Sequence, residues 1–414
     1  MLTTTLRTAK IVVATAVLPA SLLLAGATIA AASAAQPGAA VQQHEARQHA
    51  VRHVPAPHYQ VRQILNGIKL RHTFIPAGSA TPRSEALADP DDLTVLGRNL
   101  YTAFQNGVGS QGEPSTDGNA DSTIVEFTPA GRVVRQWDIK GKCDGVTADP
   151  RRGLLIATVN EDANSSVYAI IPGAPAGAQV QHYRYNKPLP HDGGTDAISI
   201  YHGLVLISAS APGTTGKAAP QPSYPAVYSV TFDRFTRIAT VSALFGDEAP
   251  ATVANLGADH GKVVRLALTD PDSNEVVPGS GPRFAGDFML TSQGDKEQIF
   301  VQPGGKLGSR LAVLRLSQSV DDTAWARHGF GRLYGADAST DTIDVVTGRF
   351  PARSIFVAVT PCDAANAPAT CPGAGFPPNY LGSLNPWTGQ ITRVPLSGPA
   401  FEPKGLLFIS FRGR

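Results

Sequence analysis

Residues 143–170, CDGVTADPRRGLLIATVNEDANSSVYAI, contain three short apolar runs separated by tight polar turns. The runs are rich in Val, Ile, Leu and Tyr, residue types that favour β-strands. The Asp-led start of this stretch recurs along the chain, and its first three copies are spaced by 52 residues. The copies begin at Asp92, Asp144, Asp196 and Asp322, with a looser one at Lys404.

Each copy is followed by a second apolar run, a polar loop, a third strand, a tight turn and a fourth strand. After Asp322, the second run is Arg332–Ala336. Four short strands in about 50 residues are typical of a propeller blade, whereas a solenoid or a sandwich does not repeat in this way. We therefore predict an all-β protein, a β-propeller of about six four-stranded blades, with five or seven as alternatives.

The predicted propeller forms a single domain over residues 61–414. Within it, residues 256–318 are interpreted as a degenerate blade with an insertion from Asp270 to Arg283. The final apolar stretch, residues 403–411, has no chain after it to finish a blade. N-terminal strands around Ile64 to Ile75 could complete this blade, so that strands from both ends of the chain close the ring.

The quoted stretch resembles the repeat of YVTN-type and NHL-type propellers, groups that are also similar to the propeller lactonases. The matching features are Gly145-Val146 before Asp149-Pro150, Gly153, a strand that ends in Val159-Asn160, and Ser165-Ser166-Val167-Tyr168. The resemblance implies the fold. It implies no catalytic residue, because the matching residues serve strands and turns.

Residues 1–35 are typical of a signal peptide: a basic start precedes the apolar stretch Ile11–Ala32 and a small-residue site. We expect cleavage near Ala34/Ala35, a secreted or extracytoplasmic protein, and no transmembrane segment in the mature chain. Residues 36–60 are predicted to be a flexible leader rich in His, Gln and Ala. The formal net charge of +2 is too small to indicate a nucleic-acid partner.

Two of the three cysteines, Cys362 and Cys371, bracket a Pro- and Ala-rich loop. In an exported protein this arrangement predicts a disulfide bond. Cys143 is left over and is interpreted as a buried thiol.

The recurrent acids Asp92, Asp144, Asp196 and Asp322 are predicted to lie on the rim of the central channel. A repeated Asp is best explained by strand-entry capping, but such a ring could also hold a divalent cation such as calcium. A second candidate for calcium is the alternating loop that contains Asp117, Asn119 and Asp121. Asx-rich turns explain that loop without a metal.

Long loops on the same rim are candidates for ligand binding, because loops longer than a hairpin requires often carry function. They supply the candidate residues Asn106, Glu113, Asn160, Glu161 and Tyr224. The preferred hypothesis is a monomeric binding module for a small molecule, a glycan or a protein. The alternatives are a metal-assisted hydrolase or lyase of the lactonase type, and a scaffold associated with the cell wall.

Overall fold

The computed structural model describes residues 58–190, 193–210, 223–364, 367, 369, 371 and 377–411. The predicted signal peptide and residues 36–57 of the predicted leader lie outside the described residues. Apart from one 3₁₀ turn, η1 (Gly67–Lys69), every regular element in the described ranges is a β-strand. In this part of the chain, no helix is long and apolar enough to cross a membrane. Residues Pro55–Arg414 form one compact unit.

Within this unit, antiparallel sheets of four strands follow one another along the chain, and a short parallel pairing of their outermost strands joins the second sheet to the third. The first three sheets are continuous in sequence. The first sheet consists of β4 (Pro90–Leu96), β5 (Asn99–Phe104), β6 (Asp121–Phe127) and β7 (Val133–Lys140). The second consists of β8 (Cys143–Asp149), β9 (Leu154–Val159), β10 (Ser166–Ile170) and β11 (Val180–Tyr185). The third consists of β12 (Ile198–Tyr201), β13 (Leu204–Ser208), β14 (Pro225–Asp233) and β15 (Ile238–Gly246).

The later sheets are less regular. One consists of β18 (Pro271–Val276), β19 (Phe288–Ser292), β20 (Glu297–Val301) and β21 (Leu311–Arg315), extended outward by β16 (Pro250–Val253) and β17 (Val263–Arg265). The next contains β22 (Val320–Trp325), β25 (Ile355–Val359), β26 (Tyr380–Leu384) and β27 (Ile391–Arg393). The closing sheet contains β29 (Leu406–Ser410), β23 (Gly331–Asp337), β24 (Thr342–Thr347), β1 (Tyr59–Asn66) and β28 (Leu396–Ser397). A separate two-stranded sheet is formed by β2 (Arg71–Phe74) and β3 (Arg83–Ala86).

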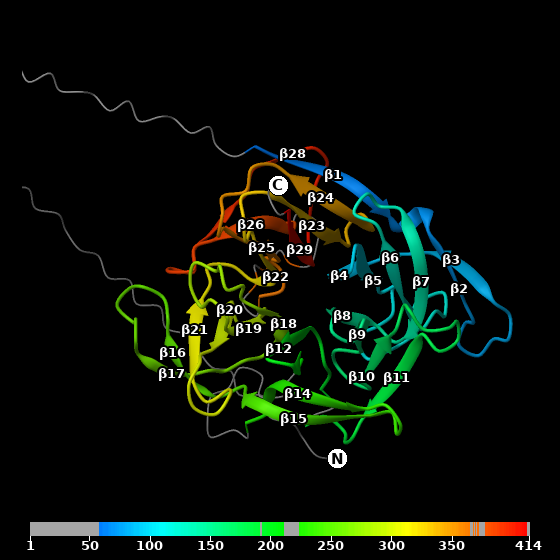
Figure 1. Cartoon of the computed structure of the whole chain (residues 1–414), viewed down its shortest axis with the longest axis horizontal. Helices are drawn as coiled ribbons and strands as arrows, with labels where there is room; N and C mark the ends of the chain where they lie inside the picture. Colours follow the sequence, from blue (N-terminus) through cyan, green and yellow to red (C-terminus); the bar gives the residue numbers. More distant parts are fainter. Residues whose placement is uncertain are drawn as a thin grey trace, which may run out of the picture. The chain divides into compact units, whose positions relative to one another are not determined.

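The innermost strands of these sheets surround a central channel, so the protein is a β-propeller (Figure 1). Each innermost strand contacts the next, and the last contacts the first, which closes the ring in the order β4, β8, β12, β18, β22 and β29. Both faces of a sheet are therefore covered by neighbouring sheets. Strands buried on both faces read as continuous apolar runs, which is the pattern of β9 and β13.

The two ends of the chain meet in the closing sheet, as the sequence predicts. The C-terminal strand β29 is innermost and pairs with β23, while the N-terminal strand β1 pairs with β24 at the outer side (Figure 1). The strand from the N-terminus is Tyr59–Asn66, so it begins within the predicted leader.

The order of strands around the closing sheet differs from the predicted order. The sequence predicts that Asp322 and Arg332–Ala336 belong to the same blade, but β22 pairs with β25, and β23 belongs to the closing sheet. The chain thus leaves one sheet after β22, forms two strands of the next, and returns. The structure also differs from the prediction of an insertion from Asp270 to Arg283. The first part of that segment is an innermost strand, β18.

Apolar side chains from facing sheets fill the spaces between them. Leu65 of β1, Phe104 of β5 and Tyr334 of β23 belong to one buried cluster that joins the closing sheet to the first sheet. Val61 and Phe356 belong to another, which joins the closing sheet to the sheet of β22. The ends of the chain are therefore held by packing as well as by backbone pairing.

We expect Val61→Ala to lower the free energy of unfolding by about 2 kcal/mol, because Val61 is 3% exposed and lies in β1 against the closing sheet. Urea denaturation measures the change. Arg62→Ala, at the exposed neighbouring position of the same strand, is the matched control and should change stability by less than about 0.5 kcal/mol. Equal effects of the two substitutions would contradict a stabilising role for β1 packing.

Candidate functional site

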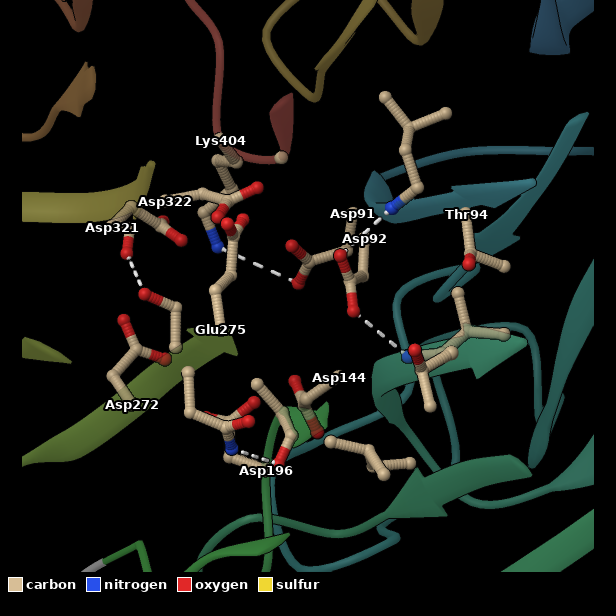
Figure 2. A pocket seen from close by; sticks show the side chains of 18 of the residues that line it. Asp91, Asp92, Thr94, Asp144, Asp196, Asp272, Glu275, Asp321, Asp322 and Lys404 are labelled. Atoms are coloured by element: carbon tan, nitrogen blue, oxygen red, sulfur yellow. Dashed lines mark hydrogen bonds and ion pairs between the residues drawn. The ribbon is translucent and has the colours of Figure 1, made fainter. Parts of the chain in front are cut away.

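A cavity of about 540 Å³ lies at the beginning of the innermost strands, where they surround the channel (Figure 2). Its lining is strongly acidic: ten carboxyl side chains face two lysines, Lys142 and Lys404. The carboxyl groups belong to Asp91, Asp92, Asp144, Glu161, Asp196, Asp272, Glu275, Asp321, Asp322 and Asp363. We refer to this cavity as the acidic pocket.

The recurrent Asp of the sequence repeat lines this pocket. Asp92, Asp144 and Asp322 lie near the starts of β4, β8 and β22, and Asp196 lies just before β12. Asp272 occupies the corresponding place in β18, and Lys404 precedes β29. Asp272 does not follow the 52-residue spacing of Asp92, Asp144 and Asp196, and the sequence predicts it within the insertion from Asp270 to Arg283. The prediction is wrong for this residue, because residues 271–276 form an innermost strand.

Two of these acids connect neighbouring blades. Asp92 accepts hydrogen bonds from the backbone N–H groups of Leu93 and of Val146 in the next innermost strand, the latter at 2.9 Å. Asp322 accepts in the same way from Thr323 and from Leu406 of β29. For these two residues, strand capping is the observed role.

Asp144 has a different environment. Its Oδ1 lies 2.8 Å from Nζ of Lys142 and accepts a hydrogen bond from the Gln105 amide at 2.9 Å. Lys142 also forms an ion pair with Glu161, and Gln105 also donates to Asp91. Burial, followed by the charge of Glu161, raises the pKa of Asp144 well above its usual value.

Lys404 lies among carboxyl groups on the opposite side of the channel. Its Nζ is 4.0 Å from Oδ2 of Asp91 (Figure 2). The negative charge of Asp91 raises the pKa of Lys404 well above its usual value, against the lowering effect of burial, and Asp321 adds to the rise. Lys404 is therefore a fixed positive charge in the pocket.

Carboxyl groups also pair with each other. Asp196 is hydrogen-bonded to Asp272, and Glu275 to Asp322. Such a contact requires a proton on one member. Burial raises the pKa of Asp196 to about 7 and that of Asp322 to about 6, and it raises the pKa of Asp272 and Glu275 well above the usual range.

Three acceptor oxygens in the pocket have no hydrogen-bond partner within the described part of the chain: Oδ2 of Asp144, Oδ2 of Asp272 and Oδ1 of Asn274. Asp144 and Asn274 are only 5% and 4% exposed. A buried acceptor without a partner costs about 1–3 kcal/mol, so these oxygens mark a place where a donor is missing.

The predicted rim residues divide into two groups. Glu161 lines the acidic pocket, but Asn106, Glu113, Asn160 and Tyr224 are not among its lining residues. Asn106 and Asn160 adopt positive φ, and their side chains bond to nearby backbone, for example Asn106 to Ala88 N–H and Asn160 to Lys142 N–H.

The remaining two rim residues have local contacts. Glu113 is exposed and accepts a hydrogen bond from Gln111 N–H. The backbone N–H of Tyr224 donates to Asp247. These contacts lie within or beside the loops themselves.

The loop that contains Asp117, Asn119 and Asp121 lies outside the pocket lining. Asn119 bonds with both the N–H and the carbonyl of Asp121, as in an Asx turn. No three His, Cys, Asp or Glu side chains of the described residues form a group that could hold a metal ion.

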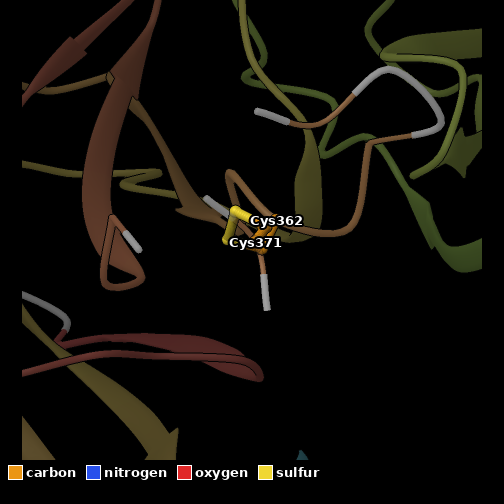
Figure 3. Close-up of a disulfide and its surroundings, with 2 residues drawn as sticks. All are labelled: Cys362 and Cys371. Atoms are coloured by element: carbon orange, nitrogen blue, oxygen red, sulfur yellow. A yellow bond between two sulfur atoms is a disulfide. The ribbon is translucent and has the colours of Figure 1, made fainter. Parts of the chain in front are cut away.

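The predicted disulfide between Cys362 and Cys371 is present, and the two Cα atoms are 5.5 Å apart (Figure 3). Cys143 is a buried free thiol, as predicted. Asp363, next to the disulfide, lines the acidic pocket and accepts a hydrogen bond from Gln293 at 3.4 Å. The disulfide thus anchors one side of the pocket.

Fold and site together define a β-propeller with an acidic pocket over its channel. One similar solved structure is Kuenenia stuttgartiensis hydrazine synthase, with 12% sequence identity and a TM-score of 0.34 over 75% of this chain and 66% of that chain. A second is streptogramin B lyase, with 11% identity and a TM-score of 0.38 over 84% of this chain and 91% of that chain. A third is a candidate 6-phosphogluconolactonase from Bacteroides uniformis, with 11% identity and a TM-score of 0.40 over 85% of this chain and 99% of that chain. No family model and no curated protein matches this chain. Matches at this level carry no information about ligand or reaction.

We expect the stability of the protein to fall as the pH rises through about 6 to 7. Asp196 and Asp322 keep their protons to about pH 7 and 6 when folded, whereas an unfolded Asp loses its proton near pH 4. Between the unfolded and folded pKa values, the folded state binds more protons than the unfolded state. The stabilisation that these two carboxyl groups contribute is therefore complete below about pH 4 and lost above about pH 7. Melting temperatures across this range measure the effect.

Asp272→Asn should make this pH dependence shallower and raise the melting temperature at pH 8, because the amide removes one buried like charge beside Asp196. Asp117→Asn, at an exposed position outside the pocket, is the control. Identical pH profiles for both variants and the unaltered protein would contradict the assigned electrostatics.

Proposed function

We propose that this propeller is a binding module that takes a cationic ligand into the acidic pocket. The observation that carries the proposal is the set of unpartnered acceptor oxygens on Asp144, Asp272 and Asn274. They lie in a cavity where carboxyl groups outnumber lysines ten to two. A ligand with positive charge and N–H donors would satisfy both the missing hydrogen bonds and the unbalanced charge.

The proposed ligand is an organic ammonium compound. The cavity of about 540 Å³ falls in the range of about 300–1,000 Å³ that is usual for small-molecule sites. Acceptors on separate innermost strands suit a ligand with several separated donors. A divalent cation such as calcium is the alternative, and oxygen ligands are what it would require.

Binding of such a ligand would release protons. The pKa values of Asp196 and Asp272 are raised by burial, and a bound cation would favour the ionised forms of both groups. Affinity would therefore increase as the pH rises through about 7.

Export is part of the proposal. It rests on the signal-like residues 1–35, and the Cys362–Cys371 disulfide is compatible with an oxidising compartment.

The test is titration calorimetry with spermidine at pH 7.5 and low salt, with triethylene glycol as an uncharged control of comparable length. Spermidine should bind, triethylene glycol should not, and the affinity for spermidine should be lower at pH 5.5. Binding of calcium without binding of spermidine would overturn the organic ligand in favour of the divalent cation.

Two substitutions with opposite expected effects make this test specific. Asp144→Asn should weaken spermidine binding by roughly tenfold, the usual effect of losing one charged hydrogen bond. Lys404→Gln should strengthen it, because it removes a competing positive charge. Asp117→Asn should leave it unchanged. The same affinity in all three variants would contradict binding in the acidic pocket.

A further inference from the structure

A second cavity, of about 530 Å³, lies between the second and third sheets, away from the acidic pocket. Arg152, which lines it, lies in the turn after β8, at the opposite end of that strand from Asp144. Among the residues that the structure describes, none lines both cavities.

The floor of this second cavity is apolar. It is formed by aliphatic and aromatic side chains of β9, β10, β11 and β14 and of the residue after β10: Leu154, Ile156, Ala169, Ile171, Tyr183 and Phe232. Tyr183 packs edge-on against Phe232, with ring centroids 5.2 Å apart, which fixes both rings. Such a floor fits a hydrocarbon or aromatic body.

Three arginines, Arg152, Arg234 and Arg237, surround the apolar floor, and no carboxyl side chain belongs to the lining as far as the chain is described. Arg237 donates to the Tyr183 hydroxyl at 3.0 Å and to the Gln181 carbonyl, both neutral acceptors. Its guanidinium lies over the Tyr183 ring at 5.3 Å, so it is held beside the floor.

The exposed edge of the cavity supports the same assignment. Phe235 is 82% exposed at the tip of the β14–β15 turn, and the Arg234 guanidinium lies 4.7 Å from the centre of its ring. An exposed aromatic ring beside a cation is an arrangement that favours contact with an amphiphile.

We propose that this cavity binds a small organic anion with a hydrophobic body, of the class of medium-chain carboxylates. The hydrocarbon chain lies on the apolar floor, and the carboxylate lies between Arg234 and Arg237. Arginine suits this role because its planar donor pair matches the two carboxylate oxygens.

The experiment titrates the full-length protein with dodecanoate, and with dodecylamine and dodecanol as ligands of the same chain length but different charge. Dodecanoate should bind, dodecanol should bind at least roughly tenfold more weakly, and dodecylamine should not bind to this cavity. Equal affinities for dodecanoate and dodecanol would overturn the proposal.

Because dodecylamine is also a cation, its binding is measured with the acidic pocket saturated by spermidine, and again in Asp144→Asn.

Arg234→Gln with Arg237→Gln should weaken dodecanoate binding by roughly tenfold or more. Arg184→Gln, at an exposed position of β11 outside the lining, is the matched control. Unchanged binding to the double variant would also overturn the proposal.

This inference does not depend on the function proposed for the acidic pocket. Dodecanoate binding should be unaffected by Asp144→Asn, and spermidine binding should be unaffected by the Arg234/Arg237 double variant. The failure of one proposal is therefore distinguishable from the failure of the other.

Discussion

Burial of both faces of each sheet is the constraint on which this structure depends. A single four-stranded sheet cannot cover its own apolar faces, but a closed ring gives every sheet two neighbours. The innermost strands must therefore approach closely at the centre. Gly145 and Gly405 permit this, because a Cβ at either position would lie within 2.7 Å of a backbone oxygen of the adjacent strand.

The same convergence creates the acidic pocket. A repeat that places Asp near the start of every innermost strand except β29, which Lys404 precedes, brings those side chains together when the ring closes. Two of them, Asp92 and Asp322, bond to the backbone of the next strand, and their presence is explained by the fold. Asp144, Asp196 and Asp272 lie among like charges, and burial raises the pKa of each carboxyl group.

Much of the fold follows from short-range patterns. The 52-residue spacing of Asp92, Asp144 and Asp196 predicts the first three sheets, and the spacing of Cys362 and Cys371 predicts their disulfide. What could not be predicted depends on long-range packing. Lys142 belongs to no motif in the sequence and Lys404 only begins the loosest copy of the repeat, so neither is predicted to lie among the carboxyl groups that the closed ring brings around them. Pro271 and the polar residues after it disguise the strand at residues 271–276, so the sequence predicts an insertion that includes Asp272.

The exchange of strands between the last two sheets has a consequence for how the chain reaches its native state. The innermost strand of the closing sheet, β29, is the last of the described strands and pairs with β23, while β1, at the outer side of the same sheet, is the first and pairs with β24. In the chain, β23 and β24 lie between β22 and β25, which pair with each other. Contacts of such sequence separation form slowly, since a large loop must close before any contact is gained. The first sheets need only contacts between neighbours in the sequence, but the ring cannot close before β29 packs between β22 and β4.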